Sequence, residues 1–253
     1  MNIDNHHEKK SLYISSSFSQ NVVWEINRLN YDLELNDVHV WKILISDHFH
    51  KLFKDYKFIL NEQELNRAKR YHSKQDFQRY LTGRITLRIL LGKYLGLQAA
   101  SIPFDFEYKK PTTGLKNSLK FNLSYSNEYI VISMSLNETG IDIEKIDTCL
   151  DYNSLLASCF SDKEIKNIKE SIDKRHENFF LQWTRKEALL KFTGQGIIDD
   201  LSNIPSLDGN HSIKKTKLKI KEDINLTSFF LNENFVGTVV YPVYISRIKY
   251  LEW

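Results

Sequence analysis

The sequence predicts an α+β protein made of two similar halves related by a pseudo-twofold axis. Strands and one long helix follow each other in the same order in both halves of the 253 residues. The long helical segments show a 3.6-residue apolar period, and the remaining apolar stretches alternate as strands do. A faint internal similarity also joins "TGRITLR" to "TRKEALL", each preceded at nearly the same distance by a helix start. It aligns Thr82 with Thr184, Arg84 with Lys186 and Leu87 with Leu189.

Each half is expected to contain a small, mainly antiparallel sheet and a long helix. We expect the first half to span residues 12–138 and the second to span residues 139–253. A cleft between two such halves is a natural place for a ligand. Residues 1–36 are weakly patterned, and the first ten are expected to be mobile.

In the first half, a strand over 37–46 precedes two helices. The helix over 60–72 opens with Asn61 and Glu64, which have the spacing of a capping box. The long helix over 73–96 has Ser73 as its N-cap and is expected to break near Gly92 or Gly96. Strands are then expected at 103–109, 119–124 and 129–136.

The second half repeats this order, beginning with a strand at 140–147. Ser161 and Glu164 again have capping-box spacing, and a long helix follows over 177–192. The tail over 212–250 alternates as strands do.

The composition indicates a globular, cytoplasmic protein. Hydrophobic residues make up 42% and aromatic residues 13% of the chain, enough for a large core. The net charge of +3 is too small to indicate nucleic-acid binding, although it suits a protein that meets anions or acidic partners. No membrane span or signal peptide is evident, and Cys149 and Cys159 have no metal-site spacing. We therefore expect a monomer in a reducing compartment, with no nucleic-acid or membrane partner.

The stretch "GIDIEKID" (140–147) places Asp142 and Glu144 two positions apart in a strand. Successive side chains of a strand point to opposite faces, so Ile141 and Ile143 share one face and the two carboxylates share the other. Two interpretations follow: a half-buried strand with a wet outer face, or a pair of oxygen ligands for a hard cation.

The stretch "WTRKEALLK" places Trp183, Glu187 and Lys191 on one face of a helix, because they recur every four residues. A solvated helix with a Glu187–Lys191 ion pair would explain this pattern equally simply. Arg84 and Arg88 likewise stand four residues apart, although like charges on one face repel each other. Either their heads are solvated, or an anion lies between them; Arg79 and Lys74 add to this basic side.

Taken together, these groups describe a site for magnesium and phosphate. Magnesium prefers a few carboxylates together with substrate phosphate oxygens. "KKP" and "FNLSYS" add Lys110 and Ser124 between the two helices. The carboxylates are Asp142, Glu144 and Glu187, and the basic groups are Arg84, Lys110, Lys186 and Lys191.

With these motifs the sequence resembles the 4′-phosphopantetheinyl transferases of the surfactin-activating (Sfp) type. "GIDIE" matches the family pattern G-I/V-D-I/V-E, and "WTRKEALLK" matches W-S/T-x-K-E-A/S-x-x-K. "KKP", "FNLSYS" and "RYHSKQDFQRYLTGRITLR" correspond to its upstream motifs and basic helix region. The resemblance covers roughly residues 60–197.

The resemblance implies a fold of two α+β halves that bind coenzyme A between them. It implies a transferase of the holo-acyl-carrier-protein synthase type, dependent on Mg²⁺. Such an enzyme moves 4′-phosphopantetheine from coenzyme A to a serine of an apo acyl or peptidyl carrier protein and releases adenosine 3′,5′-bisphosphate. Its products serve fatty-acid, polyketide or nonribosomal-peptide biosynthesis.

The resemblance also implies roles for individual residues. Asp142, Glu144 and Glu187 would ligate Mg²⁺, and Glu187, directly or through a water, would take the serine proton. Lys191 would meet the α-phosphate or the leaving group and would share catalysis with Glu187. The residues expected to bind coenzyme A are Arg79, Arg84, Lys110, Pro111, Ser124, Tyr125, Lys186 and Lys191.

One position departs from the family pattern. Tyr125 stands where the family usually has a histidine that helps to hold the coenzyme A 3′-phosphate. A phenol can donate one hydrogen bond but carries no positive charge. This departure leaves open a degenerate homologue that binds coenzyme A or a carrier protein without turnover. A third alternative is an unrelated α+β protein that matches the motifs by chance.

Overall fold

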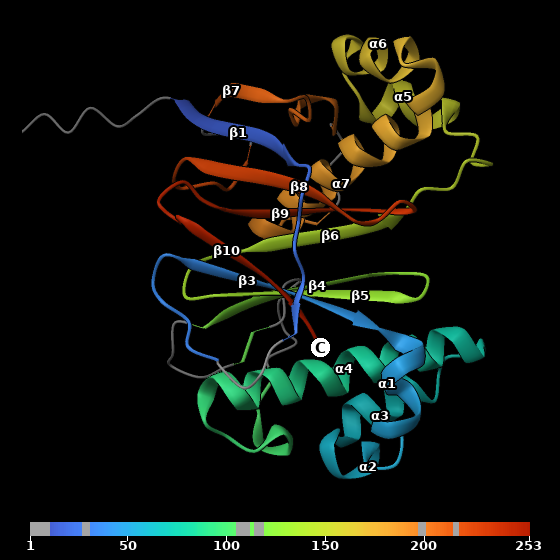
Figure 1. Ribbon diagram of the computed structural model, residues 1–253, viewed down its shortest axis with the longest axis vertical. Coiled ribbons are helices and arrows are strands. Elements are labelled where there is room, and N and C mark those ends of the chain that lie inside the picture. The colour runs from blue at the N-terminus through green and yellow to red at the C-terminus, as the bar shows by residue number, and fades with distance from the viewer. Residues whose placement is uncertain (1–10, 27–30, 105–111, 114–118, 197–200, 215–217) are drawn as a thin grey trace, which may run out of the picture.

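The computed structural model describes residues 11–26, 31–104, 112–113, 119–196, 201–214 and 218–253. It is an α+β fold in which two five-stranded sheets face each other and helices cover their outer sides (Figure 1). The predicted fold class is therefore confirmed. The expected mobile residues 1–10 and most of the expected strand at 103–109 lie outside the described residues.

One sheet, here called the β6 sheet, is built mainly by the second half of the chain. Its spatial order is β6 (Gly140–Lys145), β9 (Phe235–Pro242), β8 (Ile224–Asn232), β1 (Ser11–Ser19) and β7 (Gly209–Lys214). The other, the β3 sheet, has the order β2 (Glu25–Ile26), β10 (Arg247–Glu252), β3 (Asp37–Leu44), β5 (Tyr129–Ser135) and β4 (Lys120–Ser126).

Each sheet contains a three-strand unit of the same topology, and this repeated unit makes the two halves similar. In the β3 sheet the order β3-β5-β4 is antiparallel throughout, and β6-β9-β8 repeats it in the β6 sheet. Both sheets are nevertheless mixed, because β1 pairs with β8 in parallel and β10 pairs with β3 and β2 in parallel. The pairing is thus mainly antiparallel in the β6 sheet only.

The first and last strands of the chain each lie in the sheet of the opposite half. Strand β1 lies in the sheet of the second half, whereas β10 lies in the sheet of the first half. Strand β1 was not expected, although Leu12, Ile14 and Ser16 alternate as its buried residues. The boundary between residues 138 and 139 stays a prediction. Strands β1 and β10 each pair with strands from the other side of this boundary.

Two long helices lie on the outer faces of the sheets. They are α4 (Lys74–Leu95) and α7 (Arg175–Thr193), and they end at Gly96 and Gly194, each in the left-handed conformation. Ser73 caps α4 as predicted, and α4 runs unbroken past Gly92. The short helices are α1 (Ile45–Leu52), α2 (Tyr56–Ile59), α3 (Glu62–Ala68), α5 (Asn153–Cys159) and α6 (Asp162–Glu170).

The predicted capping boxes form at the starts of α3 and α6. Asn61 and Glu64 exchange hydrogen bonds of 2.9 and 3.0 Å at the start of α3. At the start of α6, Glu164 accepts a hydrogen bond of 2.8 Å from the Ser161 N–H.

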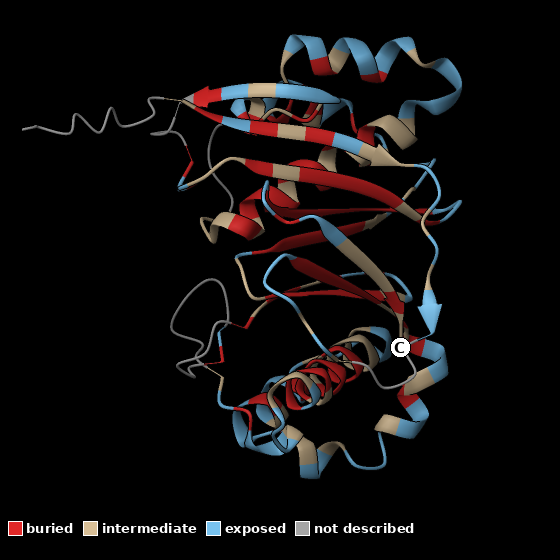
Figure 2. Cartoon of the chain, turned by 60° about the vertical axis from the view of Figure 1, so that its left-hand side comes forward, coloured by how far each residue is buried: buried red, intermediate tan, exposed pale blue. Residues whose placement is uncertain are grey.

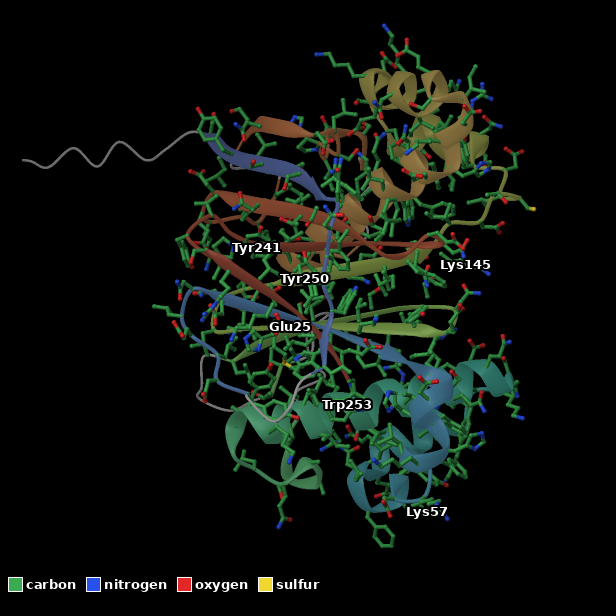
Figure 3. All side chains as sticks on the ribbon, in the orientation of Figure 1. Glu25, Lys57, Lys145, Tyr241, Tyr250 and Trp253 are labelled. Carbon is green, nitrogen blue, oxygen red and sulfur yellow. The ribbon has the colours of Figure 1, made fainter. Side chains whose placement is uncertain are left out.

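Apolar residues fill three layers, one under each long helix and one between the sheets. Figure 2 shows the buried residues concentrated on the strands and on the inner side of α4, with the short outer helices largely exposed. Figure 3 shows Tyr241 and Tyr250 in the layer between the sheets and Trp253 near α4. No helix of the described residues is both long and apolar enough to cross a bilayer.

Candidate active site

The two sheets meet at their edge strands, β4 and β6, through side chains. Every second residue of β4 points at β6, as the pleat of a strand requires. The contacts are Ile141 N–H to Asn122 Oδ1 at 3.1 Å, Ser124 Oγ to Asp142 Oδ1 at 2.8 Å and Ser126 Oγ to Glu144 Oε2 at 3.1 Å. The motif "FNLSYS" therefore joins the two halves at the candidate carboxylates of β6.

Strand β6 shows the alternation that the sequence predicts. Ile141 and Ile143 are buried between the sheets, and Asp142 and Glu144 point the other way. That second face is not wet, because α7 covers it. A Cβ on Gly140 would lie 2.3 Å from the Ala188 carbonyl oxygen, so the glycine is required for this close approach.

Helix α7 brings Glu187 and Lys191 to the carboxylates of β6. Lys191 Nζ lies 2.6 Å from Asp142 Oδ1 and 2.7 Å from Ser124 Oγ. The alternative of a solvated Glu187–Lys191 ion pair is wrong, since the ion pair of Lys191 among the described residues is with Asp142. The charged face of α7 thus points into the molecule, at the junction of the halves.

A pocket of about 400 Å³ opens beside this junction, between the halves. Its walls carry Glu187 and Lys191 at one place and several basic and aromatic side chains of the first half at another. The first-half residues include Arg67, Tyr71, Tyr80, Arg84, Asn122 and Tyr125. Sequence reasoning missed Arg67, Tyr71 and Tyr80, although "NRAKRYH" and the helical spacing of Tyr80 and Arg84 mark them as neighbours.

Burial and the charge of Asp142 raise the proton affinity of two neighbouring carboxylates, Glu144 and Glu187. Burial, followed by the charge of Asp142, raises the pKa of Glu144 to about 7, against the opposing effects of Ser126 and Lys191. Burial and then Asp142 also raise the pKa of Glu187, and Lys191 opposes this shift. Acidic groups held in this way favour a cation at the site.

The donor set fits a hard cation that would also be bound by substrate oxygens. Asp142 Oδ2 is buried and has no hydrogen-bond partner among the described residues. Nevertheless, among the residues that the structure describes, no group of three or more His, Cys, Asp or Glu side chains has the arrangement of a metal site. The three carboxylates alone therefore do not form a closed cage, as is usual for magnesium, which keeps waters and phosphate oxygens as ligands.

Of the two interpretations of Arg84 and Arg88, the structure supports an anion between them, and this anion is the carboxylate of Glu64. Arg84 donates two hydrogen bonds to Glu64 Oε1, and Arg88 donates one to Glu64 Oε2 at 2.8 Å. Arg84 still lines the pocket, whereas Arg88 is buried. Neither arginine therefore has the solvated head of the simpler interpretation.

Lys186 does not reach the pocket, and this corrects the expectation that it binds coenzyme A. Its ammonium is fully buried and donates to the Glu164 carboxylate and to the Leu201 and Ile204 carbonyls. Lys186 directly precedes Glu187 on α7, so its side chain points about 100° away from that of Glu187, here into the core.

Arg79 and Tyr125 lie together beside the pocket. The Arg79 guanidinium lies over the Tyr125 ring at 4.8 Å and also contacts Asp76. Tyr125 is 47% exposed and lines the pocket. Lys110 and Pro111 lie outside the described residues.

Two family models and several known proteins match this chain. The 4′-phosphopantetheinyl transferase superfamily model matches residues 138–240, and a model of the N-terminal part of 4′-phosphopantetheinyl transferase matches residues 48–137. The 4′-phosphopantetheinyl transferase HetI of Nostoc sp. is 34% identical over 174 residues, which cover 66% of this chain and 73% of that protein. The 4′-phosphopantetheinyl transferase Sfp of Bacillus subtilis is 26% identical over 160 residues, 61% of this chain and 70% of that protein.

Fold and site together define a two-half α+β protein in which three neighbouring carboxylates lie beside a pocket lined by basic and aromatic side chains. The chain belongs to the 4′-phosphopantetheinyl transferase superfamily, as an enzyme of the surfactin-activating (Sfp) type.

Proposed function

We propose that this enzyme takes 4′-phosphopantetheine from coenzyme A and transfers it to a serine of an apo acyl or peptidyl carrier protein. The observation that supports this most is the junction of β4, β6 and α7. There, three carboxylates and Lys191 come together from two motifs of the family, beside a pocket lined by both halves.

In the proposed reaction, the serine oxygen bonds to the β-phosphorus of the pyrophosphate. The bond from that phosphorus to the bridging oxygen breaks, and adenosine 3′,5′-bisphosphate leaves. Glu187 takes the serine proton, directly or through a water. Burial and the charge of Asp142 raise the pKa of Glu187, which makes its carboxylate a stronger base. Lys191 and Ser124 hold the phosphate oxygens, and the ammonium offsets charge on the leaving group.

Asp142, Glu144 and Glu187 would hold the magnesium ion. When bound, the ion would neutralise pyrophosphate charge. Two observations support this part of the proposal: Asp142 Oδ2 is buried without a hydrogen-bond partner among the described residues, and the pKa of Glu144 is raised. The basic wall of the pocket, Arg67 and Arg84, would meet the phosphates at the nucleotide end.

We propose a cytoplasmic location as well, because both cysteines are free thiols. The expectations of a monomer and of no nucleic-acid or membrane partner stay predictions.

The test is mass spectrometry of apo carrier proteins incubated with the enzyme, coenzyme A and magnesium. A gain equal to the phosphopantetheine group, on the carrier serine and abolished by chelation, supports the proposal. A panel of fatty-acid, polyketide and peptide-synthetase carriers would identify the client. Binding of coenzyme A with no carrier in the panel gaining mass would instead support the degenerate homologue.

A further inference from the structure

Both halves contain the same buried ion-pair arrangement, but only the first copy opens on the pocket. In each half a glutamate closes the capping box of a short helix and also accepts hydrogen bonds from a basic residue of the long helix. The pairs are Glu64 with Arg84 and Glu164 with Lys186, the positions that the internal similarity aligns. Both glutamates are almost completely buried.

The second copy is closed. Lys186 Nζ lies 3.0 Å from Glu164 Oε2 and donates to two backbone carbonyls as well. The N–H and hydroxyl of Ser206 also donate to Glu164. None of these groups lines the pocket between the halves, so this copy serves the core of the second half.

The first copy is open. Arg84 Nε and Nη2 lie 3.0 and 2.8 Å from Glu64 Oε1, and the Phe104 ring lies 4.4 Å from its guanidinium carbon. The side chain of Arg84 is 13% exposed and lines the pocket together with Glu187 and Lys191. Its guanidinium is thus held along one edge and on one face while it faces the candidate active site.

Arg88 shares the Glu64 carboxylate with Arg84. The buried Arg88 guanidinium donates to Glu64 and to the carbonyls of Ala99 and Ile102. Glu64 thus accepts hydrogen bonds from two guanidinium groups. Arg84 is the more exposed of the two and is the one that lies at the pocket wall.

We propose that Glu64 is a positioning residue, which orients Arg84 to bind a phosphate group of coenzyme A. The inference rests on the proposed function. An arginine that is already oriented loses less side-chain entropy when it binds phosphate, so orientation lowers the cost of binding. Glu64 therefore acts on substrate affinity, through Arg84, and not on the chemical step.

The test variant is Glu64→Gln, which keeps the shape of the cap and removes the charge. We expect the KM for coenzyme A to rise about fivefold or more and kcat to stay within about twofold. Calorimetric binding of coenzyme A should weaken by a similar factor. In an Arg84→Ala background, Glu64→Gln should leave the already raised KM unchanged, because the two residues act as a unit.

The matched control is Glu164→Gln, the same change in the closed copy. It should lower the melting temperature and leave the KM for coenzyme A unchanged. If Glu64→Gln does not fold because the buried Arg88 loses its partner, the double variant Glu64→Gln/Arg88→Met removes that charge and should show the same rise in KM.

An unchanged KM in folded Glu64→Gln, an additive effect on top of Arg84→Ala, or an equal rise in Glu164→Gln would each overturn the proposal. Failure of the proposed function looks different. In that case the wild-type protein itself neither binds coenzyme A nor modifies a carrier.

Discussion

Glu187 is the residue on which the proposed chemistry depends most directly. In Glu187→Gln the side chain keeps its size but can no longer take a proton. We expect kcat to fall by roughly 100-fold or more, the usual contribution of a general base. Stability should change little, because the substitution removes a carboxylate that burial and Asp142 already disfavour. Glu177→Gln, on the same helix but away from the pocket, is the control; an unaltered kcat in Glu187→Gln would exclude the role.

Tyr125 is the residue at which this sequence departs from the pattern that its motifs otherwise resemble. A charged donor to phosphate contributes about 1.5–3 kcal/mol and a neutral one about 0.5–1.5 kcal/mol. Tyr125→His should therefore lower the KM for coenzyme A several-fold and leave kcat within a few-fold. The gain should be largest below about pH 6.5, where imidazole is protonated, and the guanidinium of Arg79 over the ring moves that window lower still.

Dephospho-coenzyme A, which lacks the 3′-phosphate, is the control for Tyr125. The improvement should shrink with that substrate. An equal improvement with both substrates would show that the position does not touch the 3′-phosphate, and loss of activity would show that the phenol has a role of its own.

At the scale of the elements, the contact between β6 and α7 sets the distance between the two acidic motifs. In Gly140→Ala the new Cβ would lie 2.3 Å from the Ala188 carbonyl oxygen and 2.6 Å from the Phe192 nitrogen, both backbone atoms. Such overpacking costs about 1–3 kcal/mol. We expect that loss in urea unfolding, together with a large loss of activity, because α7 must move away from β6.

Gly83→Ala is the matched control for this contact. Gly83 lies within α4, and its Cβ would lie 3.5 Å from the side chain of Ile130 on β5, an ordinary van der Waals contact. Alanine is favoured over glycine in a helix by about 0.5–1 kcal/mol, so this variant should be at least as stable as the wild type. A Gly140→Ala protein as stable as Gly83→Ala would contradict the packing described for β6 and α7.

At the scale of the whole molecule, a pocket lined by both halves should couple ligand binding to global stability. A ligand at 100 times its Kd adds about 2.7 kcal/mol, which raises the melting temperature of a domain this size by roughly 5–10 °C. Coenzyme A and magnesium together should raise it more than the sum of each alone. The absence of such synergy in a thermal-shift experiment would argue against a site shared by cation, nucleotide and both halves.

The pH dependence of unfolding should reveal the buried His39 of β3. Burial, with the charge of Lys249 as a smaller cause, lowers the pKa of His39 from 6.5 to about 4. Between pH 4 and pH 6.5, His39 is protonated in the unfolded chain but neutral in the folded chain. His39 therefore imposes no penalty above pH 6.5, and folding stability falls as the pH drops from 6.5 toward 4, by a total on the order of 3 kcal/mol.

Urea unfolding at pH 7 and pH 4.5 tests this dependence. His39→Gln, which can still hydrogen-bond to the Tyr94 hydroxyl, should lose distinctly less stability between the two pH values. Groups that titrate in both proteins cancel in the comparison. Equal losses would mean that His39 is not the source.

Local sequence determined much of the fold and part of the site. The alternation in β6, the caps at Asn61 and Ser73, and the helical face of Glu187 and Lys191 all occur as predicted. Each depends on neighbours within about four residues, where backbone periodicity and side-chain-to-backbone hydrogen bonds decide the outcome.

Partners far apart in the chain were decided only by the tertiary structure. Sequence spacing could not show that the anion between Arg84 and Arg88 is Glu64, that Lys191 pairs with Asp142, or that Lys186 turns into the core. Nor could it show that β1 lies in the sheet of the second half and β10 in the sheet of the first half. Arg247 of β10 donates a hydrogen bond to Asp37 of β3, which lies 210 positions earlier in the chain. The local sequence offers a charged side chain many possible partners. Packing selects one of them, because a buried charge is stable only when the fold places an opposite charge beside it.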